Sequence, residues 1–325
     1  MILAGDIGGT KTNVALFEIE ETGKPLAQRS FPSGKYDSLD SIVAEFIAEH
    51  KPELTHACFG IAGPVKDGQV RTPNLKWVVD GQTLARTLGV GHVGLINDLE
   101  ATAYGIEGLG EAQLHTLNEG KAEAGAHRAL IAAGTGLGMA GLFYDGKHYR
   151  PIASEGGHID FAPRSALEYD LLNYMRERIG GRVSYERVLS GPGLLNIYSF
   201  LRDRKVAEEP DWLAEQIKAG DGSAAVSVAG LSGKSELAAL ALDHFADIYG
   251  AMAGNLALLL KATGGLYVGG GIAPKLLEKL KDGTFMKAFV DKGRMSALVS
   301  NIPVRVILDD KTALYGAARC AVKDA

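Results

Sequence analysis

Glycine clusters at three places in the chain could bring backbone N–H groups close to an anion. They are Gly8-Gly9-Thr10, Gly134-Thr135-Gly136-Leu137-Gly138 and Gly269-Gly270-Gly271, and each borders an apolar run. Without a Cβ atom in the way, successive amides can approach the oxygens of a phosphate. The first two clusters each lie between two apolar runs, so each fits either a plain β-turn or a phosphate-binding turn.

Carboxylates lie where two of the apolar runs end. Asp6 precedes the first glycine cluster, and Asn97-Asp98 follows the apolar run 92–96. Ligands of α/β proteins bind at the C-terminal ends of strands, where Asp98 could act as a general base and Asp6 could hold hydrated Mg²⁺. Asp is also a frequent turn residue and helix N-cap, so both positions keep a purely structural alternative.

A third set of polar residues suits the binding of a polyol. Glu155-Gly156-Gly157-His158 places a carboxylate and an imidazole three residues apart, and Glu186 and Asn74 lie elsewhere in the chain. Each sugar hydroxyl both donates and accepts a hydrogen bond, which such groups can satisfy. Taken alone, a histidine is more often a packing residue, Glu186 a helix-surface acid and Asn74 a turn residue.

The elements that must position these residues alternate between strands and helices, which predicts an α/β protein with a mixed sheet. We expect Ser38 and Ser235 to cap helices, segment 108–125 to be a polar crossover, and segment 210–233 to be a surface region. We expect strands over 1–5, 13–19, 57–61, 92–96 and 303–308, and helices over 83–88, 99–105, 167–179 and 312–322.

Composition limits the class of function. The 325 residues are 46% hydrophobic and 22% charged, as in a globular protein, and a net charge of −5 gives no basic field for nucleic acid. Cys58 and Cys320 are too few for a disulfide scaffold, which favours a reducing cytoplasm. The N-terminal residues do not resemble a signal peptide or a membrane anchor. We therefore expect a small-molecule substrate.

Several familiar signatures are absent. Gly233-Lys234-Ser235 lacks the opening glycine of a P-loop, because Val228 stands in its place. Both glycine hairpins lead back into a strand, which disfavours a dinucleotide-binding fold. No serine lies in a G-x-S-x-G motif and no histidine pair has H-E-x-x-H spacing, so acyl transfer and zinc proteolysis have no support.

Taken together, these segments resemble the bacterial glucokinase family, within the sugar kinase, Hsp70 and actin superfamily. The matching segments occur in family order from residue 5 to about residue 274. They are Gly5–Thr10 and Ala133–Gly138 as phosphate hairpins, Gly269–Ile272 as an adenosine segment, Ile96–Asp98 as a catalytic segment, and Glu155–Pro163 and Glu186–Gly193 as sugar segments.

The resemblance implies a role for each of these residues. Asp98 would be the base that takes the proton from the sugar 6-hydroxyl, and Asp6 would lie near Mg²⁺ through water. The glycine clusters would hold ATP. The remaining sugar hydroxyls would be held by Asn97, Glu155, His158 and Glu186, with Asn74 also assigned to the substrate.

The resemblance also implies a ribonuclease H-like fold of the actin and hexokinase type, with two α/β lobes and mixed sheets around an interlobe cleft. The small lobe would comprise residues 1–108 with 309–325, and the large lobe residues 109–308. Lys11 stands where this group often has Asn, as in a related family of repressors and kinases. That family carries a Cys-rich zinc motif after its Gly-His, which Ile159–Pro163 replaces here, so we expect no zinc.

The expected activity is ATP-dependent phosphorylation of glucose at its 6-hydroxyl, in a cytoplasmic homodimer that binds neither nucleic acid nor membrane. Mannose, fructose or an N-acetylhexosamine remains an alternative substrate, because related hexoses share most hydroxyl contacts. ADP or polyphosphate remains an alternative phosphoryl donor. A non-catalytic sugar sensor on the same fold is a further alternative.

Overall fold

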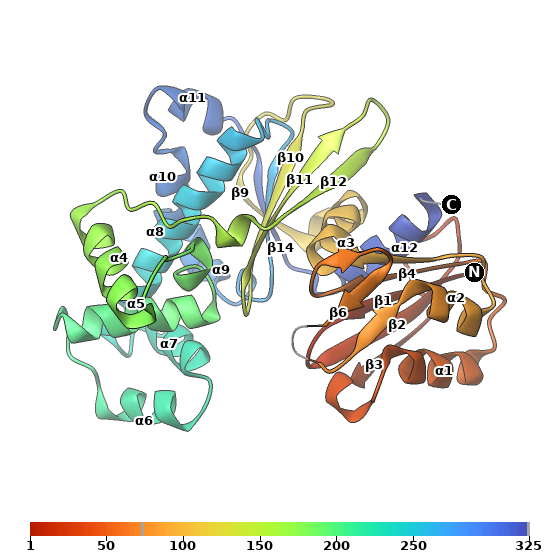
Figure 1. The fold of residues 1–325 in the computed structure, drawn as a ribbon. Coiled ribbons are helices and arrows are strands. Elements are labelled where there is room, and N and C mark those ends of the chain that lie inside the picture. The colour runs from red at the N-terminus through yellow and green to blue at the C-terminus, as the bar shows by residue number, and fades with distance from the viewer. Residues whose placement is uncertain (73–74, 324–325) are drawn as a thin grey trace. The chain divides into compact units, whose positions relative to one another are not determined.

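The computed structural model describes residues 1–72 and 75–323 and shows an α/β protein with mixed sheets, as predicted (Figure 1). Its contacts divide the chain into two units, which are described separately. One comprises Met1–Gln113, Tyr149–Ala153 and Asp309–Ala325, and the other comprises Leu114–His148 and Ser154–Leu308.

The first unit contains a five-stranded sheet in the order β3-β2-β1-β4-β8. The strands β1, β2 and β3 are antiparallel neighbours, whereas β1, β4 and β8 run parallel. The C-terminal ends of the three parallel strands therefore meet at one edge of the sheet. The strands are β1 (Ile2–Ile7), β2 (Lys11–Phe17), β3 (Ala27–Pro32), β4 (His56–Ile61) and β8 (Val93–Asn97).

Three helices accompany the N-terminal part of this unit: α1 (Leu39–His50), α2 (Gly81–Leu88) and α3 (Asp98–Gly105). Ser38 caps α1 as predicted, because its side chain accepts a hydrogen bond from the Ser41 N–H at 3.2 Å. A separate three-stranded sheet consists of β5 (Val65–Lys66), β6 (Gln69–Arg71) and β7 (Val78–Asp80).

The last helix, α12 (Thr312–Lys323), packs against α3, β1 and β4 of the first unit (Figure 1). Its residues Leu314 and Ala317 share one buried core with Ile2 and Ala4 of β1. At Gly316 the two helices approach so closely that an added Cβ atom would overlap the backbone carbonyl of Ala101 in α3. The helix that begins at Asp98 is thus supported by a segment about 200 residues further along the chain.

The second sheet has six strands in the order β12-β11-β10-β13-β14-β9. Antiparallel β10 and β11 form a hairpin, and β10, β13 and β14 run parallel. Segment 108–125 contains the point at which the chain passes from the first unit to the second, as expected of a crossover, and it also forms β9, which pairs antiparallel with β14. The strands are β9 (Leu114–Asn118), β10 (Arg128–Ala133), β11 (Leu137–Tyr144), β12 (Tyr149–Ser154), β13 (Leu266–Gly269) and β14 (Val304–Ile307).

The long helix α8 (Glu236–Leu259) is central to the second unit and contacts β10, α5, α7, α9 and α10 (Figure 1). Ser235 caps it as predicted and accepts from the Ala238 N–H at 3.2 Å. Segment 210–233 is mostly exposed, as expected of a surface region, and it contains two helices that the sequence did not predict. The other helices are α4 (Ala166–Ile179), α5 (Gly191–Asp203), α6 (Asp211–Ala219), α7 (Gly222–Leu231), α9 (Leu277–Lys281), α10 (Thr284–Val290) and α11 (Ser296–Val299).

Within residues 1–72 and 75–323, no one helix has the length and hydropathy of a membrane span. The bent pair α7 and α8 meets that criterion only when both helices are counted together.

Candidate active site

Asp6 lies one residue before the end of β1, opposite Asn13 of β2 and Gly60 of β4 in the register of the sheet. The Asn13 side chain donates from Nδ2 to Oδ2 of Asp6 at 3.4 Å. Ser30 donates to Oδ1 of the same asparagine at 2.7 Å. Because its oxygen is occupied by Ser30, Asn13 presents its N–H groups to Asp6.

Asn97 and Asp98 lie where β8 passes directly into α3. Asn97 is the N-cap: its Oδ1 accepts from the Leu99 N–H at 2.9 Å, and its Nδ2 donates to the Gly63 carbonyl at 3.2 Å. Asp98 is the first helical residue, and its Oδ1 accepts from the same Leu99 N–H at 2.9 Å. The sequence-based alternative that Asp98 is the N-cap was therefore wrong by one position. A carboxylate in the first turn is stabilised by the helix dipole.

The Asp6 carboxyl is buried, and the charges of two further carboxylates act on it. Burial raises the pKa of the Asp6 carboxyl to about 6, and the charges of Asp98 and Asp310 act in the same direction, while Asn13 and Lys11 oppose them. Asp310 lies just before α12 and was not singled out from the sequence, although it repeats the pattern of Asp98: a strand end, an acid and then a helix. The three carboxylates thus belong to one edge of the first unit.

This chemistry fits a divalent cation. Burial and the neighbouring acids make the ionised form of Asp6 unfavourable. A cation beside Asp6 would offset this cost with its positive charge. Among the residues that the structure describes, no group of three or more His, Cys, Asp or Glu side chains could hold a metal by itself. Mg²⁺ suits such a place, because it takes one or two carboxylates and completes its shell with water and substrate phosphates.

The first glycine hairpin, between β1 and β2, is held by Ser33. Its hydroxyl donates to the Gly8 carbonyl at 2.8 Å and shares a hydrogen bond of 2.9 Å with Oγ1 of Thr12. Its N–H donates to the Thr10 carbonyl at 3.0 Å. Both Ser33 and Thr12 are fully buried. The hairpin that contains Gly8, Gly9 and Thr10 is therefore held by Thr12 of β2 and by Ser33, which begins the short helix η1 (Ser33–Lys35) directly after β3.

The second glycine hairpin, between β10 and β11, is held by residues from further along the second unit. Within it, the Gly134 N–H donates to the Gly136 carbonyl at 2.8 Å. The Gly191 N–H donates to the Gly134 carbonyl at 2.9 Å, and Oε2 of Glu186 accepts from the Leu137 N–H at 3.0 Å. Thr135 and Gly138 complete the predicted phosphate segment, and Gly138 pairs with Ala132 of β10.

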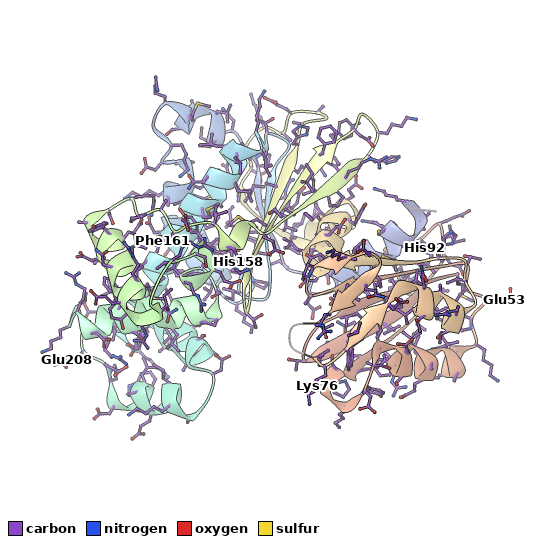
Figure 2. All side chains as sticks on the ribbon, viewed as in Figure 1. Glu53, Lys76, His92, His158, Phe161 and Glu208 are labelled. Carbon is purple, nitrogen blue, oxygen red and sulfur yellow. The ribbon has the colours of Figure 1, made fainter. Side chains whose placement is uncertain are left out.

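The two predicted sugar segments are paired with each other. Glu155 directly precedes the short helix η4 (Gly156–His158) and His158 is its last residue, and the ring Nε2 of His158 lies 3.9 Å from Oε2 of Glu155. Beyond it, the Tyr185 N–H donates to the Ile159 carbonyl at 3.0 Å, and the rings of Phe161 and Tyr185 pack edge to face. Figure 2 labels His158 and Phe161 on this segment.

Glu186 follows Tyr185 in the chain and therefore lies near the η4 segment. Gly157 of that segment lies against the Leu137 carbonyl of the hairpin. Glu155 and His158 themselves are exposed. The structure thus groups Glu155, His158 and Glu186 beside the second hairpin. Asn74 lies outside the described residues.

The third glycine cluster begins at the end of β13, the parallel neighbour of β10. Gly269 pairs with Ala132, and Gly270 has a left-handed backbone (φ 82°) and packs so closely on the Ala133 carbonyl that a side chain would overlap it. The Ile272 N–H donates to the same carbonyl at 3.2 Å. This cluster, which includes Gly271, is thus joined to the base of the second hairpin.

Comparison with known proteins identifies the family. The sequence model of the Glucokinase family matches residues 3–324. A glucokinase from Nostoc sp. is 43% identical over 341 residues, which cover 99% of each chain. The crystal structure of a glucokinase from an Antarctic psychrotroph is similar with a TM-score of 0.85 at 31% identity, over 99% of this chain and 98% of that one.

A ROK family glucokinase from Streptomyces griseus, solved in complex with glucose and AMPPNP, shares the fold with a TM-score of 0.65 at 23% identity, over 99% of each chain. The fold is thus that of the sugar kinases. The chain itself belongs to the glucokinase family, which confirms the resemblance seen in its sequence.

Proposed function

We propose that this protein is a glucokinase that transfers the terminal phosphoryl group of ATP to the 6-hydroxyl of glucose, which yields glucose 6-phosphate and ADP. The observation that carries the proposal is the match of the glucokinase family over residues 3–324. The relative from Streptomyces griseus, solved with glucose and an ATP analogue, supports this choice of substrates.

Asp98 is the proposed general base. It takes the proton from the 6-hydroxyl as the oxygen attacks the phosphorus atom, so that the new O–P bond forms while the bond to the ADP oxygen breaks. Its place in the first turn of α3, with Oδ1 fixed by the Leu99 N–H, supports this role because a base must be held in one orientation.

The sugar is proposed to be held by Asn97, Glu155, His158 and Glu186, and Asn74 is assigned to the substrate by family resemblance alone. The cap bonds of Asn97 use one hydrogen of its amide and one lone pair of its oxygen, which leaves capacity for a hydroxyl. The exposure of Glu155 and His158 likewise supports their availability to a ligand.

The glycine clusters are proposed to hold the nucleotide. Gly8, Gly9, Thr10 and the 134–138 hairpin would face the phosphates, and Gly269–Gly271 the adenosine. Phosphoryl transfer depends mainly on positioning and on neutralising charge, which backbone amides can provide. Mg²⁺ bound near Asp6 would neutralise phosphate charge, and the burial of the Asp6 carboxyl, with the charges of two further carboxylates acting on it, supports that site.

We also propose that residues 1–108 with 309–325 and residues 109–308 act as the two lobes of the kinase, and that it works as a cytoplasmic homodimer in glycolysis. The acidic composition and the two buried free cysteines support a reducing compartment without a nucleic-acid partner.

A coupled assay of the purified protein tests substrate and donor together. Glucose, mannose, fructose and N-acetylglucosamine are compared with ATP, ADP or polyphosphate as donor, with and without Mg²⁺. We expect the highest kcat/KM for glucose with ATP and Mg²⁺. A higher value for another hexose would move the assignment to that sugar, and binding of glucose without turnover would indicate a sensor.

Replacement of the base tests the mechanism. Asp98→Asn keeps an oxygen that can accept from Leu99 N–H, so the fold is retained, while kcat falls by about 10²- to 10⁴-fold. Asp37→Asn, at an exposed position of the same unit, is the matched control and should leave kcat unchanged. Near-normal turnover of the Asp98 variant would contradict the assignment.

A further inference from the structure

The second glycine hairpin is the point at which all three proposed binding segments of the second unit meet. The Ala133 carbonyl contacts the adenosine segment through Gly270 and the Ile272 N–H. Four residues on, the backbone of Leu137 contacts both sugar segments. Phosphate, adenosine and sugar segments are therefore joined through one short turn.

The sugar segment 186–191 holds this hairpin at two points. Glu186 accepts from the Leu137 N–H at 3.0 Å on one side of the turn, and Gly191 donates to the Gly134 carbonyl at 2.9 Å on the other. Gly191 is itself fixed, because its carbonyl accepts from the Ser223 hydroxyl of α7 at 2.7 Å. One end of this contact is thus rigidly anchored, whereas the other depends on a side chain.

That side chain is the proposed sugar ligand. Oε2 of Glu186 lies 2.6 Å from where a Cβ atom on Gly136 would be, so the absence of a side chain at residue 136 permits the carboxylate to reach the hairpin. A carboxylate has two oxygens and can accept several hydrogen bonds, so one oxygen can serve the Leu137 N–H and the other a hydroxyl. A sugar that fixes Glu186 would also fix the hairpin.

We propose that Glu186 couples the two substrates: glucose bound to its carboxylate orders the 134–138 hairpin through the Leu137 N–H and so strengthens nucleotide binding. The physical basis is entropic. The first ligand restricts the side chain and the turn, and the second ligand binds a hairpin that is already ordered. The coupling is reciprocal, so the nucleotide strengthens glucose binding by the same factor. This inference rests on the proposed function.

Calorimetric titration of the full chain measures the coupling as the ratio of the Kd for AMPPNP without and with saturating glucose. We expect glucose to tighten AMPPNP binding by about fivefold or more, a usual size for coupling between sites. Gly136→Ala displaces the Glu186 carboxylate from Leu137 and should reduce that ratio to below about twofold. Because the ratio compares the same variant with and without sugar, a change in either separate affinity cancels.

Gly181→Ala is the matched control. It introduces the same methyl group in the same unit, at a position where the added Cβ meets no atom within 4 Å, and it should keep the wild-type ratio. An unchanged ratio in Gly136→Ala would overturn the proposal. So would a ratio of one in the wild-type protein when both ligands bind. Failure of the wild-type protein to bind glucose would instead contradict the proposed function.

Hydrogen exchange followed by mass spectrometry gives a second readout that needs neither nucleotide nor turnover. Glucose alone should slow exchange in a peptide that spans residues 134–140 of the wild-type protein and should have a smaller effect in Gly136→Ala. If that variant does not fold, the wild-type measurement still decides the matter. Bound glucose that leaves this peptide unprotected would overturn the proposed coupling.

Discussion

The hairpin between β1 and β2 is held by hydroxyl groups of β2 and of the short helix η1 directly after β3, whereas the hairpin between β10 and β11 is held by segments that follow it by about 50 to 140 residues. Ser33 and Thr12 brace the first. Glu186, Gly191 and Ile272 hold the second. The same strand, glycine turn and strand can therefore be either a self-supporting local unit or a junction, and only distant contacts distinguish the two.

The largest effect on stability is expected where the second hairpin meets the adenosine segment. Gly270→Ala places a side chain on a left-handed residue (φ 82°) and against the Ala133 carbonyl. We expect a loss of about 3 kcal/mol in the free energy of unfolding, measured by urea denaturation. Gly271→Ala, whose added Cβ meets no atom, should change it by less than about 0.5 kcal/mol. Equal midpoints would show that the junction is not rigid.

The second predicted effect is an increase in the free energy of unfolding, and it comes from Asp6, in the strand that leads into the first hairpin. The pKa of Asp6 is raised to about 6 from its ordinary 3.8, so between these values the folded protein binds a proton that the unfolded chain lacks. The contribution of Asp6 to the free energy of unfolding therefore falls as pH rises through this window. Asp6→Asn should stabilise the protein by about 1–3 kcal/mol at pH 7.5 without Mg²⁺.

Urea denaturation at two pH values checks this prediction. The gain from Asp6→Asn should shrink as pH falls through 6 and disappear below the ordinary pKa of 3.8, where the wild-type carboxyl is protonated in both states. The variant should also lose activity, because it removes the proposed cation ligand. A variant less stable than wild type at pH 7.5 would mean that the ionised carboxylate supports the fold.

A smaller loss is expected when the brace of the first hairpin is removed. Ser33→Ala deletes the hydrogen bonds to the Gly8 carbonyl and to Oγ1 of Thr12 in a fully buried place, which should cost about 1–2 kcal/mol. Ser30→Ala, an exposed serine in the same sheet, is the control and should cost less than about 0.5 kcal/mol. Thermal denaturation of both variants measures this difference in stability. Equal melting temperatures would mean that water replaces the Ser33 hydroxyl and that the brace does not stabilise the fold.

The smallest effect on stability is expected in the turn of the second hairpin itself, away from the residues that hold it. Gly134→Ala adds a Cβ that meets no atom within 4 Å, so the free energy of unfolding should change by less than about 0.5 kcal/mol. If the open side of the turn holds phosphate, the same methyl group should weaken AMPPNP binding, measured by calorimetry. Unchanged AMPPNP affinity would place the phosphates elsewhere.

The sequence predicted those elements whose cause is local. Ser38 and Ser235 mark the starts of α1 and α8 because a hydroxyl cap satisfies a free backbone N–H wherever the helix packs. Strand β9 was missed because its residues alternate weakly and are all partly exposed; it exists because β14 offers it a pairing edge. Helix α7 has three Ala residues but also two each of Gly, Ser and Val, which lower its helical propensity, and it packs against α8.

The residues of the candidate site likewise include some that local sequence predicts and some that depend on distant contacts. Asp98 could be singled out because a strand end, a polar pair and a helix follow one another in sequence. The contact of Glu186 with Leu137 could not be predicted from spacing, since its immediate neighbours resemble an ordinary helix surface. Asp310 was missed because its effect on Asp6 depends on α12 returning to β1, which no local pattern specifies.

The return of α12 to the first unit also governs the order in which the chain can fold during synthesis. Ile2 and Ala4 leave the ribosome about 310 residues before Leu314 and Ala317, with which they share their core. At about 5–20 residues per second, the β1 strand waits tens of seconds for this helix. The supports of α3, and so of Asp98, are therefore completed late, whereas β10, β11 and α8 can assemble before synthesis reaches α12.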